Sequence, residues 1–362
     1  MQVGPEDLLG LREEGYRLGF YNQVWRQTLV DIDSTLYRLR VMAFAAWREK
    51  PAPGWTVLKN APVKRYEAPN LVIDGKLYVI GGFSGQETQA LTRTDIFDPA
   101  TSCWSPGPAL PIPITHVTPA TFGGEVWIAG GYYGDHPGPS DDVALSFEPA
   151  SSEWRRRAPL PTPTASAMLV EHAGRLHAIG GYLDRDATTA AHWVLAPDGN
   201  KWEPLAPMKH PRGHHTAVSI NGRIYVFGGQ FQHDTNPLDL AVVEAYDAEA
   251  DRWDEPSPMP APRSHVETST IVRDGRVVLL GGLDRARSLR IRGLPDVVSY
   301  DPTADRWCVL PPLPIGLIGP TAKVIGDKLY LTGGMDLLRP GAAQAGTLSI
   351  DAAAALDPSP NA

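Results

Sequence analysis

Three histidines and a glutamate share one repeated position in this chain. The same spacing, 14 residues before a Gly-Gly pair, is found for Glu67, His116 and His214. His265 stands 16 residues before such a pair, and two extra residues in the hairpin of its repeat would explain the difference. Imidazole and carboxylate groups bind iron, zinc or copper. If the fold brings them together, we expect them to hold one divalent metal. Alternatively, a histidine acts as a metal-free general base or acid, or the imidazoles only line a water-filled channel.

Three arginines lie two residues before this repeated position. They are Arg65, Arg212 and Arg263. A planar guanidinium binds a carboxylate or phosphate through two parallel hydrogen bonds. We therefore expect these arginines to bind the substrate, either a small acidic molecule or an acidic peptide. The alternative is that each is a surface arginine paired with a nearby acid.

The residues that follow the Gly-Gly pairs add further candidates for substrate binding. They include Tyr132, Tyr133, Gln230 and His233. The sequence contains no phosphate-binding loop, no Gly-x-Ser-x-Gly elbow and no His-Glu-x-x-His motif. With His116, His214 and His265 as the catalytic candidates, the chemistry that fits is isomerisation, cyclisation or elimination.

The elements that must position these side chains come from a repeat of about fifty residues. A Gly-Gly pair closes an apolar run six times, beginning at Gly81, Gly130, Gly180, Gly228, Gly281 and Gly333. Each unit predicts four short strands, with turn signals such as Asn221-Gly222 between the first two. Four-stranded sheets bury both faces by packing against each other around an axis, which makes a β-propeller.

The repeated Gly-Gly, acid and tryptophan resemble the Kelch repeat over about residues 55 to 351. The resemblance implies an all-β, six-bladed propeller over residues 51–351, similar in architecture to bacterial N-acetylneuraminate epimerase. The sixth unit lacks a tryptophan after its Gly-Gly, whereas Trp55 has no Gly-Gly before it. We therefore expect residues 51–63 to supply the outer strand of blade six and close the ring. In Kelch proteins the loops that carry the candidate residues meet at the channel mouth.

The segment that precedes the repeats has a different pattern. Apolar residues recur every three or four positions, at Trp25, Leu29, Ile32, Leu36 and Leu39. This spacing predicts a helical extension over residues 1–50 with one apolar face. The helix would cap the propeller, or mediate a homodimer or grip a partner. Residues 352–362 are expected to be a C-terminal tail.

Composition excludes several classes of protein. The chain of 362 residues has 33 basic and 41 acidic residues and a net charge of −8, which disfavours a nucleic-acid partner. Two cysteines are too few for a disulfide framework. The sequence shows no signal peptide and no apolar run long enough to span a membrane. We expect a cytoplasmic enzyme for a small acidic metabolite; the alternative is a non-enzymatic module that binds an acidic peptide.

Overall fold

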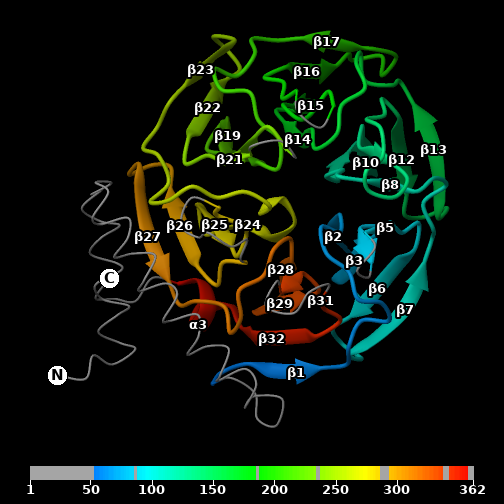
Figure 1. The fold of residues 1–362 in the computed structure, drawn as a ribbon, viewed down its shortest axis with the longest axis vertical. Helices are drawn as coiled ribbons and strands as arrows, with labels where there is room; N and C mark the ends of the chain where they lie inside the picture. The colour runs from blue at the N-terminus through cyan, green and yellow to red at the C-terminus, as the bar shows by residue number, and fades with distance from the viewer. Residues whose placement is uncertain are drawn as a thin grey trace.

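Six four-stranded antiparallel sheets surround a central axis (Figure 1). The computed structural model describes residues 53–357 except 85–87, 185–186, 234–236, 286–292 and 337–341. The helix expected over residues 1–50 lies outside the described residues. Among the described helices, none is long and apolar enough to cross a bilayer.

Each blade runs from an inner strand beside the axis to an outer strand at the rim. Blades one to three consist of β2 (Asn70–Ile73), β3 (Lys76–Ile80), β6 (Thr94–Asp98) and β7 (Cys103–Gly107); β9 (Ala120–Phe122), β10 (Glu125–Ala129), β12 (Ala144–Glu148) and β13 (Glu153–Arg157); and β14 (Met168–His172), β15 (Arg175–Ile179), β16 (His192–Leu195) and β17 (Trp202–Pro204). Blades four to six consist of β18 (Thr216–Ile220), β19 (Arg223–Phe227), β22 (Val243–Asp247) and β23 (Arg252–Asp254); β24 (Thr270–Arg273), β25 (Arg276–Leu280), β26 (Val297–Asp301) and β27 (Arg306–Leu310); and β28 (Thr321–Ile325), β29 (Lys328–Thr332), β32 (Thr347–Asp351) and β1 (Thr56–Leu58).

The loops and the C-terminus add smaller elements. Four two-stranded ribbons pair β4 (Phe83–Ser84) with β5 (Gln89–Ala90), β8 (Ile114–Thr115) with β11 (Tyr132–Tyr133), β20 (Gln230–Phe231) with β21 (Leu238–Asp239), and β30 (Met335–Asp336) with β31 (Ala342–Ala343). A 3₁₀ helix, η1 (Glu267–Ser269), precedes β24, and a short helix, α3 (Ala352–Leu356), follows β32. The expected C-terminal tail therefore begins as a helical turn.

The first and last described strands close the ring, as the sequence predicts. Strand β1 pairs antiparallel with β32, with Thr56 opposite Ser349 and Leu58 opposite Thr347. The outer strand of blade six therefore comes from the opposite end of the chain, and the ends of the ring hold each other in register.

Apolar contacts between blades form the core. Between blades one and two, for example, Leu71 and Ile80 pack in one buried cluster with Val126 and Ile128. Four of the repeated tryptophans, Trp104, Trp202, Trp253 and Trp307, add a polar link, because their indole N–H groups donate to a carbonyl about one repeat earlier; Trp202 Nε1 donates to Ala158 O at 3.0 Å. Each blade is therefore held by its neighbours on both faces.

The Gly-Gly pairs are required where one blade meets the next. Gly130 has a φ of +68°, in the left-handed region, and a Cβ built on it would lie 2.0 Å from the carbonyl oxygen of Thr164. The next residue, Gly131, donates its N–H to this same oxygen at 2.9 Å. Only glycine permits this approach.

Two histidines buried in blade three make stability depend on pH. His177 Nδ1 lies 2.9 Å from His192 Nε2, and burial lowers their pKa values to about 3 and about 4. An unfolded histidine binds a proton near pH 6.5, so below this pH the unfolded state binds more protons. The free energy of unfolding therefore falls from pH 7 to pH 5, by up to about 2 kcal/mol per histidine.

Urea unfolding at these two pH values measures the effect. His177→Phe is expected to remove up to about 2 kcal/mol of the pH-dependent loss. His210→Asn, at a side chain that is 43% exposed, is the matched control and should leave the loss unchanged. Equal pH dependence in wild type and His177→Phe would contradict the assignment.

Candidate functional site

Six equivalent residues, one per blade, form a ring around the axis. We call them the axial ring: Glu67, His116, Ser166, His214, His265 and Gly319. All six have a φ between +47° and +58°. Backbone hydrogen bonds join neighbouring members, as from Ser166 N to His116 O at 2.8 Å and from His265 N to His214 O at 3.1 Å. The sequence prediction that this repeated position converges on the axis is therefore correct in its geometry.

This conformation is costly for five of the six residues. A left-handed backbone suits Gly319, where a Cβ would lie 2.7 Å from Cγ of Glu67. At residues with a side chain it costs of order 1 kcal/mol or more each, and such outliers cluster at functional sites. The ring therefore maintains strained positions that carry three imidazoles and a carboxylate.

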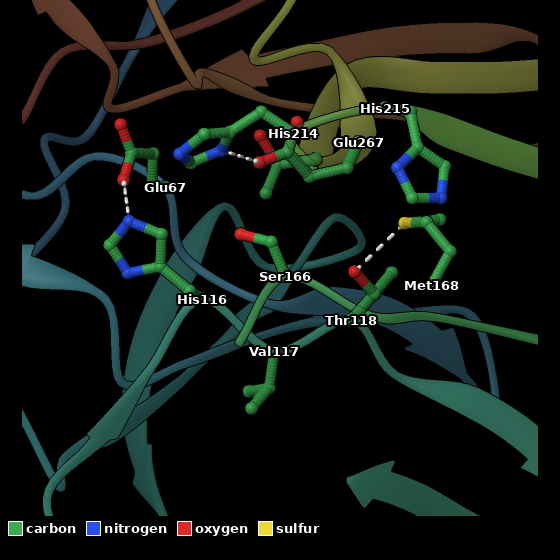
Figure 2. Close-up of a pocket in the computed structure, with 10 residues that line it drawn as sticks. Glu67, His116, Val117, Thr118, Ser166, Met168, His214, His215 and Glu267 are labelled. Atoms are coloured by element: carbon green, nitrogen blue, oxygen red, sulfur yellow. Dashed lines mark hydrogen bonds and ion pairs between the residues drawn. The ribbon is translucent and has the colours of Figure 1, made fainter. Parts of the chain in front are cut away.

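His214 is held by a carboxylate on one side and faces a second histidine on the other. Its Nδ1 lies 3.1 Å from Glu267 Oε1, and its Nε2 lies 3.1 Å from Nε2 of His233. Figure 2 shows His214 directed at Glu267. A carboxylate on Nδ1 fixes the tautomer that leaves Nε2 free to bind a metal, which is a common arrangement of metal-binding histidines.

Glu67 lies between the other two ring histidines. Its Oε2 is 3.6 Å from His116 Nε2, and its Oε1 is 3.7 Å from His265 Nε2 (Figure 2 shows the first contact). The Nδ1 atoms of these histidines are held by the preceding residues, Thr115 at 3.1 Å and Ser264 at 2.8 Å. Both rings therefore present Nε2 towards one carboxylate.

Burial sets the charges in this cluster. The pKa values of His116 and His265 lie well below normal, first because of desolvation and then because of nearby His214. For His214, desolvation is outweighed by the hydrogen bond and charge of Glu267, so its pKa is raised. Desolvation raises the pKa of Glu67 to about 7. His116 and His265 are thus neutral imidazoles at neutral pH, whereas His214 would have to give up its Nε2 proton to bind a metal.

Among the described residues, one group of three histidines could hold a metal ion. The ligand-capable atoms of His116, His214 and His233 lie within 4.8 Å of one another. Tetrahedral coordination with bonds of about 2.0–2.1 Å separates two nitrogens by about 3.3 Å, close to the 3.1 Å between His214 and His233. The adjoining cavity, about 10 Å³, has room for about one water molecule.

His265, expected as a metal ligand, is not in this group. Its ring stacks on His214 with centroids 3.8 Å apart, and its Nε2 is directed at Glu67. His233, expected to bind substrate, supplies the third imidazole instead. The register of the ring brings His265 close, but its nitrogens are not among the ligand-capable atoms that lie within 4.8 Å of one another.

The expected role of the three arginines as a substrate clamp is corrected. Arg65, Arg212 and Arg263 are at most 3% exposed. Arg65 forms an ion pair with Asp95 and donates to Val79 O and Gly81 O, and Arg212 likewise pairs with Glu244.

Arg263 follows the same pattern in blade five. It donates to Gly281 O at 2.7 Å and to Asp296 O at 3.0 Å. The arginines thus tie the Gly-Gly turn to the third strand of their own blade. The sequence contains a signal for this inward pairing. Each of these three blades has an acidic residue 14 to 16 residues after the first glycine of its Gly-Gly pair.

The other expected substrate-binding residues have different surroundings. The ring of Tyr132 lies edge-on to His116, with centroids 4.8 Å apart, so it lines the cluster. Tyr133 is 46% exposed and faces away from the buried core. Gln230 is fully buried and donates to Asp239 Oδ1 at 3.1 Å. Gln230 therefore supports the site from behind rather than contacting a ligand.

Glu267 is the functional residue that the sequence reasoning missed. From the sequence we expect the two extra residues of blade five to lie in the hairpin between its first two strands. That hairpin has only a two-residue turn, Asp274-Gly275, between β24 and β25, so the insertion lies elsewhere. The insertion instead forms η1, which carries Glu267 beside His214. The Asp274-Gly275 turn signal in the sequence could have shown that the insertion precedes β24.

One cation near the cluster keeps unsatisfied hydrogen-bond donors. Arg285 is half-buried, and its Nε and Nη1 atoms are buried without a partner among the described residues. It lies close enough to Glu67, His214 and His265 to lower the pKa of each. Arg285, in the loop after the Gly-Gly of blade five, can therefore meet an anion at the cluster.

Family comparisons agree with this architecture. The KLHDC2/KLHL20/DRC7 Kelch-repeats domain matches residues 115–334, and the Kelch motif matches residues 64–111. The chain belongs to the Kelch-repeat family. Its six blades are thus Kelch repeats, with the last one completed by β1.

Several Kelch proteins are similar over part of the chain. Kelch-like protein terF of Aspergillus terreus is 34% identical over 110 residues, which is 30% of this chain and 24% of that protein. N-acetylneuraminate epimerase of Haemophilus influenzae is 30% identical over 87 residues, which is 24% of this chain and 23% of that protein. The matches thus span about a quarter of these curated relatives.

A solved structure has a similar fold over most of the chain. "Structure of YjhT" matches with a TM-score of 0.66 and 15% identity, covering 80% of this chain and 95% of that chain. At this identity the likeness shows the fold alone. The relatives named above thus include an enzyme, and function must be argued from this chain's own site.

Proposed function

We propose that this Kelch ring is an enzyme that binds a small acidic metabolite at the axial ring and isomerises, cyclises or eliminates it. A divalent metal, iron, zinc or copper, is held by His116, His214 and His233. The observation that carries the proposal is the chain of contacts from Glu267 through His214 to His233. Three protein nitrogens and an open position make the usual set of a catalytic metal site.

Glu67 suits the proton transfer that these reactions share. The metal would polarise a substrate oxygen as a Lewis acid. The Glu67 carboxylate, within 4 Å of His116 and His265, would accept a proton from the neighbouring substrate carbon. Delivery of that proton to an adjacent atom would complete an isomerisation, and loss of a leaving group would complete an elimination.

A positively charged side chain near the cluster supports an acidic ligand, but it is not one of the three arginines predicted from the sequence. Arg65 and Arg212 are neutralised by buried acids. Arg285 has donors beside the cluster that no described residue accepts. It is therefore the candidate partner for a substrate carboxylate at the mouth, by a charge-assisted hydrogen bond.

Two measurements on untagged protein test this proposal. Metal analysis after purification without chelators is expected to find one equivalent of metal per chain. Incubation with a panel of acidic sugars and hydroxy acids in D₂O should exchange a carbon-bound hydrogen of the substrate for deuterium, detected by NMR, and chelation should stop the exchange.

Either measurement can overturn the proposal. If neither purified protein nor protein reloaded with Zn²⁺, Fe²⁺ or Cu²⁺ retains metal after dialysis, the metal site is wrong. If metal is bound but no acid exchanges hydrogen, the enzyme assignment is wrong. Binding of an acidic peptide that depends on Arg285 would then favour the interaction module.

A further inference from the structure

A second cavity lies within the central channel and adjoins the histidine cluster. Its volume is about 140 Å³, and residues beside the inner strands of all six blades line it. It shares Thr118, Met168, Glu267 and Thr268 with the small cavity at the cluster. A ligand in this channel would therefore lie next to the proposed metal site.

Among the described residues that line this channel cavity, Lys323, on the inner strand β28, is the only lysine or arginine. Its side chain is partly exposed to the channel. Among the described residues, no carboxylate forms an ion pair with Lys323 and no acceptor hydrogen-bonds to it. Burial lowers the pKa of Lys323 to about 8, so the ammonium form still predominates at neutral pH. An enclosed ammonium without a partner costs free energy that a bound anion would recover.

Glu267 supplies an acceptor to the same cavity. Its Oε1 is engaged by His214, whereas its Oε2 is buried without a hydrogen-bond partner in the described part of the chain. Buried polar atoms are normally paired. The channel therefore offers a free donor group at Lys323 and a free acceptor at Glu267.

The channel hydroxyls contribute less. Thr268 donates to Pro320 O at 2.9 Å and Thr270 donates to Val266 O at 2.8 Å, so both protons are used by the backbone. Thr118 donates to the sulfur of Met168, a weak acceptor that a better one can displace. Recognition in this cavity thus depends on Lys323 and on two acceptors, Glu267 Oε2 and Asn70 Oδ1, which are buried without a partner among the described residues, with Thr118 available to assist.

We propose that the channel is a binding site for a small carboxylate that also carries a hydroxyl or ammonium group. Lys323 binds the carboxylate, and the hydroxyl or ammonium donates to Oε2 of Glu267. This site would hold the substrate of the proposed enzyme. Only the claim that the ligand is the substrate rests on the proposed function. Binding itself requires no metal.

Ligand-observed NMR on protein freed of metal by EDTA tests the site with acetate and glycolate as probes. Wild type should bind both, and glycolate should bind more tightly if its hydroxyl donates to Oε2 of Glu267. Lys323→Met and Lys323→Gln are each expected to weaken both probes by roughly tenfold or more. Lys328→Met, at an exposed lysine on the adjacent strand β29, is the matched control and should bind like wild type.

Two results would overturn the channel site: no binding of either probe to wild type, or wild-type affinity in both Lys323 variants. Metal content of the Lys323 variants is measured in parallel and should equal that of wild type. Failure of carboxylate binding with metal binding intact would remove the channel site alone. Failure of metal binding with carboxylate binding intact would remove the metal site alone.

Discussion

Replacing His214 with Ala is expected to abolish stoichiometric metal binding. His214 is the central ligand of the proposed site, since its Nε2 faces His233 and its Nδ1 is fixed by Glu267. Glu267→Gln keeps an oxygen for this hydrogen bond but loses the charge, and loss of such an outer partner typically costs about 10–100-fold in metal affinity. His214→Ala should cost more than this, because a ligand itself is gone.

Metal titration of the purified variants measures these effects. His265→Ala is the matched control, because this ring stacks on His214 without sharing the ligand group. It should retain one equivalent of metal. Retention of metal by His214→Ala, or equal loss in His265→Ala and His214→Ala, would contradict the assignment of His116, His214 and His233 as the ligands.

Replacing Arg212 with Met is expected to lower the free energy of unfolding by about 3–5 kcal/mol. Arg212 and Glu244 are both completely buried and form an ion pair. Arg212 also donates to Val242 O at 3.1 Å and to Gly228 O at 3.3 Å. Removing the guanidinium leaves the Glu244 carboxylate in the protein interior without its counter-charge, which is the main source of the loss.

A second substitution separates this cause from a simple packing defect. Arg212→Met combined with Glu244→Gln removes the uncompensated charge and should recover a large part of the loss in urea unfolding. Arg252→Met is the control, because Arg252 is 62% exposed and pairs with Asp254 at the surface; its effect should stay within about 1 kcal/mol. If the double variant is no more stable than Arg212→Met, buried charge is not the cause.

Repetition made much of this protein predictable. Because Glu67, His116, His214 and His265 hold one register against the Gly-Gly pairs, their convergence on the axis follows from the symmetry of a closed ring. The pairing of β1 with β32 was predictable in the same way, from a tryptophan without a repeat before it. Such features depend on periodic backbone positions, which a sequence displays directly.

Side-chain direction was not predictable, and the arginines show why. The three arginines, Arg65, Arg212 and Arg263, lie at the expected backbone positions beside the mouth. Their long side chains, however, point into the blade, where they bind backbone carbonyls and acidic residues. The position of a residue in a repeat fixes its Cα, whereas its partners decide where a flexible side chain ends. Those partners lie 14 to 33 residues away along the chain.

The sequence alone determined the number of blades, the closure of the ring and the repeated position that forms the axial ring, since these follow from spacing. Only the tertiary structure decided that His233 lies with His116 and His214, that Glu267 contacts His214, and that Lys323 lines the channel, with no ion pair to any described residue. These relations join loops and strands of different blades. They depend on how each imidazole ring and carboxylate is oriented, to within a few ångströms. The spacing of residues along the chain does not determine this orientation.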